Sequence, residues 1–267
     1  MKKNHKIPKI SAIMPVYNGE KFLEESLKTI LNQTFKDFEL IIINDGSTDN
    51  SLKIIKKNKD KRVILINNKK NKGSVLAIDA GFKIAKGKYI AIFTQDDLSH
   101  PKRLEIEFNY LENHPHIFLV GTSAILIDEN GKEISRFRKY DDYKMLAWRL
   151  RKSNSIIFPS IMFRNEDVFF DGHYEYHLYY KLLKRGENLT NIPNFLVKYR
   201  VHPKSESIFD KKQQEHLRDE VIDKFRKLPD TVSALKKVYF SVKLFMHYIR
   251  TINEKKIFMS KKYKPYK

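Results

Sequence analysis

Residues 89–97 read Tyr-Ile-Ala-Ile-Phe-Thr-Gln-Asp-Asp, so two adjacent carboxylates directly follow an apolar run. The run predicts a buried strand, and carboxylates avoid the end of such a strand unless a positive partner meets them there. A divalent cation that carries a diphosphate would be such a partner, because Mg²⁺ is often held by one or two carboxylates plus substrate phosphates. A solvated turn, or Asp97 as a helix N-cap before Pro101, explains the pair equally well on its own.

The composition is that of a folded protein. The chain has 267 residues, of which 41% are hydrophobic and 12% aromatic, which is enough for a large core. No apolar run approaches the ~20 residues that span a bilayer, and the charged N-terminus lacks the apolar stretch of a signal peptide. Cysteine is absent, which excludes disulfides and thiolate zinc sites. We therefore expect a cytoplasmic protein, with peripheral attachment to the inner face of a membrane as the alternative.

The net charge of +20 indicates a preference for anions such as nucleic acid, anionic lipid or phosphorylated small molecules. We find no nucleic-acid-binding motif, so that class is disfavoured. Residues 211–267 hold sixteen Lys and Arg against six Asp and Glu, and apolar side chains at helical spacing run through 231–253. A basic amphipathic helix of this kind can lie on anionic lipid. Such helices more often pack on their own domain or on a second subunit, so we expect the helix of 231–253 to pack on this domain or in a homodimer.

The first half of the chain alternates between strands and helices. Apolar runs predict strands, and helical periodicity predicts helices, one of them with Ser47 or Thr48 as its N-cap. The predicted strands are 9–14, 38–43, 63–66 and 89–93, and the predicted helices are 20–33, 47–58 and 74–86. Such alternation implies βαβ units and a parallel sheet that is buried on both faces.

The second half is less regular, with expected helices at 101–113, 141–152 and 174–185 and expected strands at 117–127, 132–138, 155–163 and 195–201. We expect one domain over 1–203, with a nucleotide-binding part at about 8–100 and an acceptor part at about 101–203. A basic helical extension would follow over 204–267. Ligands bind at the carboxyl ends of the strands in open parallel sheets, so the loops at 15–18, 44–46 and 94–97 should converge on one crevice.

Several spaced stretches resemble family 2 glycosyltransferases with a GT-A fold. They are Ser-Ala-Ile-Met-Pro-Val-Tyr-Asn-Gly at 11–19, Leu-Asn-Gln-Thr at 31–34, Ile-Asn-Asp-Gly-Ser-Thr-Asp at 43–49, Ala-Lys-Gly-Lys-Tyr-Ile at 85–90, the acidic loop, and Tyr-Arg-Val-His-Pro at 199–203. The resemblance covers about residues 8–207. It implies a Rossmann-like, mostly parallel α/β sheet flanked by helices, followed here by the C-terminal helical extension.

The resemblance also implies an activity: inverting transfer of a sugar from a nucleotide diphosphate sugar, most often a UDP-sugar, with Mn²⁺ or Mg²⁺. The acceptor would be a hydroxyl of a glycan, a lipid-linked sugar or a protein, as in the biosynthesis of cell-surface polysaccharides. A Rossmann dehydrogenase is disfavoured, because no Gly-x-Gly-x-x-Gly follows the first strand.

Donor-binding positions follow from the family pattern. A proline or aromatic ring against a nucleotide base is favourable by ~1–3 kcal/mol, and a carboxylate can accept a hydrogen bond from a pyrimidine N–H. Asp45 matches that carboxylate, although an Asx turn would also explain it. Glu20 would reach the ribose or serve as a first-turn helix carboxylate. The positions implied for the nucleotide are Pro15, Val16, Tyr17, Glu20, Asp45, Gly46, Lys72, Gly73, Asp79, Gln95 and Asp96.

Some of these positions depart from the family. The family commonly has Asn where Asp79 stands, and Lys72 is the expected phosphate partner of that segment. In the acidic loop, Thr94 stands where the Asp-x-Asp pattern begins. Asp96 matches its last carboxylate, the usual metal contact. Asp97 and His202 would complete the metal site, and Arg200 would pair with phosphate or with a nearby carboxylate.

Inverting transfer needs a base that deprotonates the acceptor hydroxyl. Aligned through Leu178, Tyr179 and Lys181, the chain places Glu175 where the family base stands, with His177 and Asp171 as alternatives. The non-catalytic alternative is that Glu175 is a carboxylate in the first turn of a helix, where the helix dipole favours it. Because Thr94 and Glu175 both replace family aspartates, a catalytically impaired nucleotide-sugar-binding module is the rival hypothesis.

Overall fold

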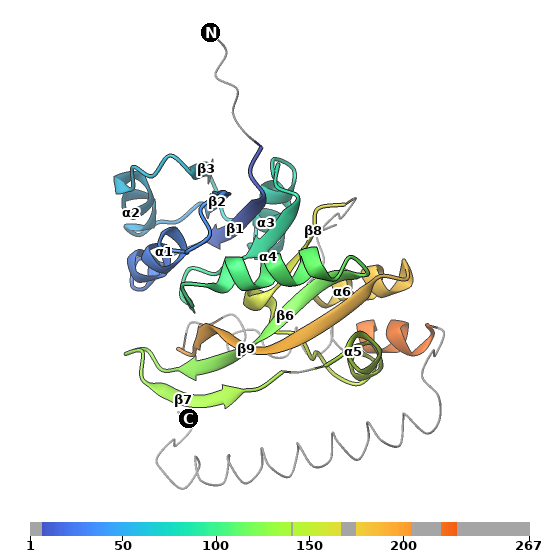
Figure 1. The fold of residues 1–267 in the computed structure, drawn as a ribbon. Coiled ribbons are helices and arrows are strands. Elements are labelled where there is room, and N and C mark those ends of the chain that lie inside the picture. Colours follow the sequence, from blue (N-terminus) through green and yellow to red (C-terminus); the bar gives the residue numbers. More distant parts are fainter. Residues whose placement is uncertain (1–6, 140, 167–174, 204, 206–219, 229–267) are drawn as a thin grey trace, which may run out of the picture. The chain divides into compact units, whose positions relative to one another are not determined.

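The structure is a computed structural model, and it describes residues 7–139, 141–166, 175–203, 205 and 220–228. Its described part contains a nine-stranded sheet with the order β3-β2-β1-β4-β8-β6-β9-β5, and β7 pairs with β6 beside this path (Figure 1). The first four strands are parallel, as the sequence predicts. They are β1 (Ile10–Val16), β2 (Phe38–Asp45), β3 (Val63–Asn68) and β4 (Tyr89–Ile92).

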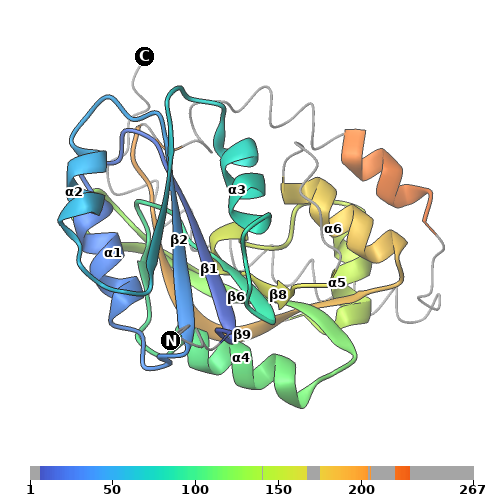
Figure 2. The same cartoon turned by 90° about the horizontal axis from the view of Figure 1, so that it is seen from above.

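The second half of the sheet is mixed. The long strands β6 (Ile117–Ile127) and β9 (Asn188–Arg200) run parallel to each other, whereas the remaining pairings are antiparallel. The short strands of this half are β5 (Leu98–Ser99), β7 (Glu133–Phe137) and β8 (Met162–Arg164), and a 3₁₀ turn covers Phe158–Ser160. The sheet curls between the helices that flank it (Figure 2).

Helices cover both faces of the sheet (Figure 2). One face buries side chains from α1 (Leu23–Leu31), α2 (Ser51–Lys57) and α4 (Arg103–Asn113). The other face buries side chains from α3 (Ser74–Phe82), α5 (Tyr143–Leu150), α6 (Glu175–Lys184) and residues 220–228. Alternate residues of each parallel strand serve the two cores, which explains why these strands are apolar throughout.

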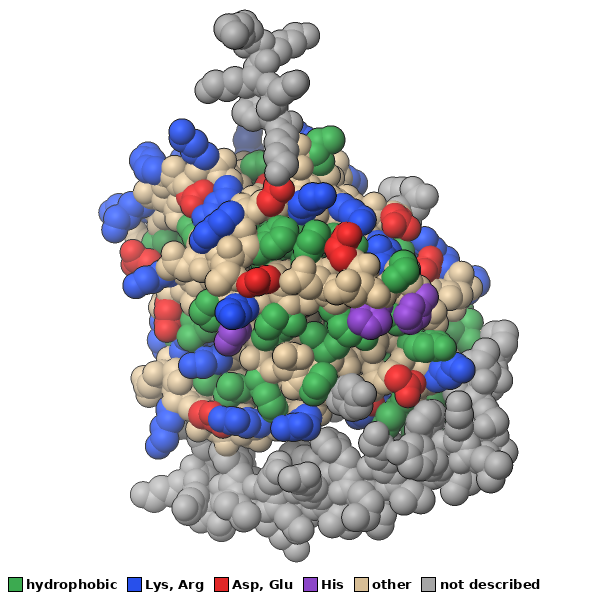
Figure 3. Space-filling view, in the orientation of Figure 1, with side chains coloured by type: hydrophobic (Ala, Val, Ile, Leu, Met, Phe, Trp, Pro, Cys, Tyr) green, Lys and Arg blue, Asp and Glu red, His purple; other side chains and the backbone are tan. Residues whose placement is uncertain are grey.

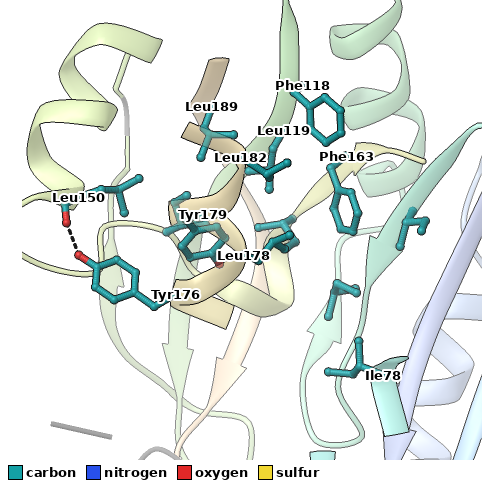
Figure 4. Packing of buried hydrophobic residues seen from close by; sticks show 14 of the residues in the cluster. Ile78, Phe118, Leu119, Leu150, Phe163, Tyr176, Leu178, Tyr179, Leu182 and Leu189 are labelled. Carbon is teal, nitrogen blue, oxygen red and sulfur yellow. Dashed lines mark hydrogen bonds between the residues drawn. The ribbon is translucent and has the colours of Figure 1, made fainter. Parts of the chain in front are cut away.

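Helix α6 is held in the second of these cores. Tyr179 and Leu182 pack toward β6 and β8, where Phe163 lies, and the Tyr176 hydroxyl donates a hydrogen bond to the Leu150 carbonyl (Figure 4). The Phe225 ring packs on that of Tyr176, with the centroids 5.0 Å apart. Residues 220–228, which the sequence assigns to the extension, therefore pack into the same core as the sheet.

Several boundaries differ from the sequence-based expectations. The expected strand over 155–163 is wrong, because a 3₁₀ turn covers Phe158–Ser160 and β8 begins only at Met162. Helix α2 begins at Ser51, so neither Ser47 nor Thr48 is its N-cap; that prediction was wrong because both residues bind the preceding loop instead. Strand β1 continues through Pro15, which lies past the last β4 residue paired with β1 and so needs no N–H on that side. Strand β9 begins at Asn188 rather than at 195, because its first half pairs with β6 despite a polar sequence.

The chain divides into two compact units, residues 1–228 and 229–267. The predicted amphipathic helix of 231–253 lies in the second unit, outside the described residues. None of the helices in the described ranges is long and apolar enough to cross a bilayer.

Candidate active site

The loop after β1 and the acidic loop after β4 are joined by one side chain. The Gln95 Oε1 accepts the Tyr17 N–H at 2.9 Å, and its Nε2 donates to the Tyr17 carbonyl at 3.0 Å. A Cβ at Gly19 would lie 2.4 Å from Gln95 Oε1, so only glycine leaves room for this clamp. The sequence suggested Gln95 as a nucleotide contact; in the structure its amide positions Tyr17, whose side chain is 43% exposed.

The same first loop is bonded to the loop after β2. The Asn18 Oδ1 accepts the Thr48 N–H at 2.8 Å, and the Asn18 N–H donates to Ser47 Oγ at 3.1 Å. The Glu20 Oε2 accepts the backbone and side-chain N–H groups of Asn50, at 3.0 and 2.8 Å. Glu20 therefore lies before α1 (Leu23–Leu31) and binds Asn50 at the start of α2, so the expected first-turn role in its own helix is wrong, while the ribose contact remains a prediction.

Asp45 ends β2 and is 2% exposed. Its Oδ2 accepts the backbone N–H groups of Lys72 and Gly73, at 2.8 and 2.9 Å, and its Oδ1 accepts the Asn68 side-chain amide at 2.7 Å. A carboxylate has about four lone-pair positions. Three are therefore used within the protein, and one on Oδ1 is left for a ligand N–H.

The neighbours of Asp45 are arranged around this cradle. Gly46 has a φ of 70°, and a Cβ there would lie 2.5 Å from the Lys70 carbonyl carbon, as expected for a position that requires glycine. The Lys72 side chain is exposed, whereas Asp79 forms an ion pair with Lys83 at 2.7 Å. Asp79 therefore stabilises α3, and the geometry gives its predicted nucleotide contact no support.

The structure brings Asp96 and His202 together. The Asp96 Oδ2 lies 3.0 Å from His202 Nε2, and the two side chains are 21% and 11% exposed. The Phe22 ring packs on the imidazole with its centroid 5.0 Å away. A carboxylate and an imidazole at this spacing are suitable ligands for Mn²⁺, which accepts both oxygen and nitrogen.

The Asp97 carboxylate does not join the Asp96–His202 pair and has other partners. Its Oδ2 accepts the Thr94 hydroxyl at 2.6 Å, and its Oδ1 accepts the Arg200 N–H at 2.8 Å. Burial, and then the charge of Asp96, raise the pKa of Asp97 to about 8. Within the described ranges no three His, Cys, Asp or Glu residues form a metal-binding group. Asp97 as a metal ligand remains a prediction, but the geometry assigns it to holding the loop.

Arg200 is 2% exposed, and its guanidinium is used within the protein. The Nε donates to the Asp96 carbonyl at 2.9 Å, Nη1 donates to the Glu129 carbonyl at 2.9 Å, and Nη2 pairs with Glu25 Oε2 at 2.7 Å. The Phe22 ring covers its face at 4.6 Å. The predicted phosphate contact of Arg200 thus competes with four protein groups, and a positioning role fits the geometry better.

The candidate bases lie at or near the start of α6. Glu175 is the first residue of this helix and is half-buried. His177 is buried, and its Nε2 lies 3.3 Å from Lys224 Nζ. Asp171 lies outside the described residues.

Several residues that shape the acidic loop were missed from the sequence. The Ser26 hydroxyl lies 2.8 Å from the Thr94 carbonyl and 2.7 Å from that of Asp97. The buried Arg103 donates to the Ile92 carbonyl at 2.8 Å and pairs with Glu107 at 3.0 Å. Only the last pair left a signal, because an Arg and a Glu four positions apart share a helix face.

Comparisons with known proteins show the family of this chain. A sequence model described as "Glycosyl transferase family 2" matches residues 11–170. An uncharacterized glycosyltransferase of Methanocaldococcus jannaschii is 35% identical over 207 residues, which cover 73% of this chain and 71% of the relative. One of Haemophilus influenzae is 33% identical over 227 residues, covering 78% and 70%.

Two solved structures share the fold at low sequence identity. S. aureus TarS 1–349 in complex with UDP-GlcNAc has a TM-score of 0.66 at 16% identity, covering 87% of this chain and 70% of that one. The mannosyltransferase PcManGT from Pyrobaculum calidifontis, in complex with GDP-Man and Mn²⁺, has a TM-score of 0.64 at 17% identity, covering 85% and 66%. The sequence matches show that this chain belongs to glycosyltransferase family 2.

Proposed function

We propose that the protein is an inverting glycosyltransferase that moves a sugar from a nucleotide diphosphate sugar to an acceptor hydroxyl. The observation that carries the proposal is the 3.0 Å approach of Asp96 and His202 at the carboxyl end of the parallel strands. The Asp45 cradle ends a strand of the same parallel sheet, and ligands bind along that edge in such sheets.

The nucleotide base would rest against Pro15 and the exposed Tyr17, whose backbone is held by the Gln95 clamp. The remaining lone pair of Asp45 Oδ1 would accept the N–H of a pyrimidine. This favours a UDP-sugar, and the related fold of TarS has been solved with UDP-GlcNAc. The exposed Lys72 is available to a phosphate.

Asp96 and His202 would hold a divalent cation, which when bound neutralises charge on the leaving diphosphate. The imidazole ligand favours Mn²⁺ over Mg²⁺. The remaining ligands would come from the donor phosphates and water, because the described residues bring only these two side chains together.

Glu175 would accept the proton of the attacking hydroxyl, and it stands in the first turn of α6, where the helix dipole favours a negative charge. His177 is less suited to this role, since it is buried beside the Lys224 ammonium. The acceptor would be a glycan, a lipid-linked sugar or a protein, and membrane contact or dimerisation through residues 204–267 belongs to the same proposal.

The test is to incubate the full chain with Mn²⁺ and a panel of UDP-, GDP- and dTDP-sugars and to measure nucleotide release. We expect release from one UDP-sugar, loss of release with EDTA, and recovery when Mn²⁺ is restored. If calorimetry detects nucleotide binding but no nucleotide is released, the result would instead support the catalytically impaired binding module. Thr94, which stands at a family aspartate position, is the residue that favours this alternative. Absence of nucleotide binding would refute both.

A further inference from the structure

A row of side chains crosses four strands beside the acidic loop. Leu98 of β5 pairs with Lys198 of β9, Lys198 pairs with Ile125 of β6, and Ile125 pairs with Arg136 of β7. Directly opposed residues point to the same face of a sheet. Since Leu98 immediately follows Asp97, the row leads from the acidic loop to β7.

This face is open to solvent within the described part of the chain. Lys198 and Arg136 are exposed, and Leu98 and Ile125 are half-buried. The adjacent row points to the opposite face and contains Val197 at 2% and Ala124 at 0% exposure. The Lys198 row therefore faces away from the core, whereas the next row on the same face, which contains Ile127 and Arg200, is covered, at 1% and 2% exposure.

The open face is basic and carries one aromatic ring. The guanidinium groups of Arg136 and Arg138 lie 5.6 and 5.7 Å from the Phe195 ring centroid. Glu133 pairs with Arg136, and the hydrogen bond from Arg136, together with the charge of Lys198, lowers the pKa of Glu133, so two cations of this face act on one carboxylate. We name this surface the basic strip; it consists of Leu98, Ile125, Arg136, Arg138, Phe195 and Lys198. Lys and Arg side chains line the lower margin of the surface in Figure 3, where β7 lies in Figure 1.

The far end of β6 ties the strip to the candidate site. The turn between β6 and β7 is bonded to Arg200 through the Glu129 carbonyl, and the Glu129 carboxylate pairs with Lys21 of the first loop. Arg200 in turn holds Asp96. The strip and the Asp96–His202 pair are therefore parts of one connected framework.

We propose that the basic strip binds the acceptor, and that this acceptor is a glycan that carries phosphate. The inference rests on the proposed function, because only a sugar transferase needs an acceptor beside its donor site. The excess of cations selects an anionic chain, and the aromatic ring offers a face to a sugar. A flat row across four strands suits a linear chain better than a membrane, because a bilayer contact needs protruding apolar side chains.

The experiment compares two variants of the full chain with equal charge changes. One is Arg136→Gln/Arg138→Gln/Lys198→Gln in the strip; the control is Lys53→Gln/Lys56→Gln/Lys57→Gln on the exposed side of α2. The probe is a fluorescein-labelled phosphomannan oligosaccharide, used intact and after phosphatase treatment. Binding is measured by fluorescence anisotropy, and UDP affinity by calorimetry on the same samples.

We expect the strip variant to bind the phosphorylated probe about fivefold or more weakly, with unchanged UDP affinity, and the control to behave as wild type. The single variant Lys198→Gln should show a smaller loss, which guards against misfolding of the triple variant. Equal affinity for the intact and dephosphorylated probes, or an equal loss in the control, would overturn the proposal. The proposal would also be overturned if the strip variant lost binding to phosphatidylglycerol vesicles but bound the phosphorylated glycan as tightly as wild type. If UDP affinity is unchanged when either of these results is obtained, only the acceptor proposal fails and the proposed donor site is not contradicted.

Discussion

The imidazole of His202 and the carboxylate of Asp96 lie 3.0 Å apart although 106 positions separate them in the chain. The pair is built from the end of β9 and the loop after β4. Among the described residues, no third His, Cys, Asp or Glu joins the pair in a metal-binding group.

Replacing His202 by Ala should weaken Mn²⁺-dependent UDP binding by roughly tenfold or more, because a ligand of the cation is lost. Calorimetry with UDP, with and without Mn²⁺, measures this effect. His116→Ala is the control, since this exposed imidazole contacts Tyr143 and not the acidic loop. Equal weakening in the absence of Mn²⁺ would argue that His202 acts on the loop and not through a cation.

The Asp45→Asn substitution should disrupt the cradle, because an amide cannot accept from both the Asn68 side chain and the Lys72 and Gly73 N–H groups. We expect a loss of about 1–3 kcal/mol in the free energy of unfolding and weaker nucleotide binding. Urea unfolding and calorimetry provide the two measurements. Asp79→Asn removes only an ion pair with an exposed lysine and should change either quantity little.

The Gln95→Ala substitution should release Tyr17, whose backbone N–H and carbonyl both bond the Gln95 amide. Nucleotide affinity should fall while the sheet stays intact, because the clamp holds the backbone of the residue proposed to meet the base and lies outside the core. Near-ultraviolet circular dichroism checks the fold, and UDP titration measures the affinity. Unchanged affinity would mean that Tyr17 does not meet the base.

Glu107 should give stability a pH dependence. Burial raises the pKa of Glu107 to about 7, although the Arg103 charge opposes the shift. Between its unfolded pKa near 4.5 and this folded value the native state binds the extra proton, so the free energy of unfolding should fall as pH rises from about 4.5 to 7. Urea unfolding across this range should show this fall in the wild-type protein. The fall should be smaller in Glu107→Gln, which lacks the titrating carboxyl, and as large as in wild type in Glu105→Gln. Parallel curves for wild type and Glu107→Gln would contradict the assignment.

Glu175→Gln should reduce kcat by a factor of about 10²–10⁴ and leave donor affinity unchanged, because the amide cannot take the acceptor proton. His177→Gln should have a far smaller effect on kcat. Steady-state nucleotide release with a saturating donor distinguishes the two. A kcat that falls with His177 and not with Glu175 would move the base to the buried imidazole.

The sequence was most informative for strands whose own residues are apolar enough to predict them without knowledge of their pairing partners. The apolar runs that end at Val16, Asp45 and Ile92 are buried on both faces, so periodicity alone predicts a parallel sheet. The family resemblance and the GT-A fold are confirmed by the same segments. The polar first half of β9 was missed, because its residues are strand only by pairing with β6.

The candidate site shows the complementary limit. The family resemblance pointed to Asp45, Asp96 and His202, but it could not tell which way each side chain points. Asp96 and Asp97 are neighbours with opposite environments, one beside His202 and the other bonded to Thr94 and Arg200. Likewise, a buried arginine that holds backbone carbonyls looks in sequence like one that binds phosphate.

The contacts of Arg200 bear on how the enzyme acquires its activity during synthesis. They reach Glu25, 175 positions earlier, and Asp96, 104 positions earlier. Such long loops must close before the contacts can form. A nascent chain that has emerged only to the end of the family match at residue 170 can assemble the four parallel strands, yet it lacks the guanidinium that anchors its acidic segment. Catalytic competence should therefore arise late on the ribosome, in one step with the arrival of the last long strand.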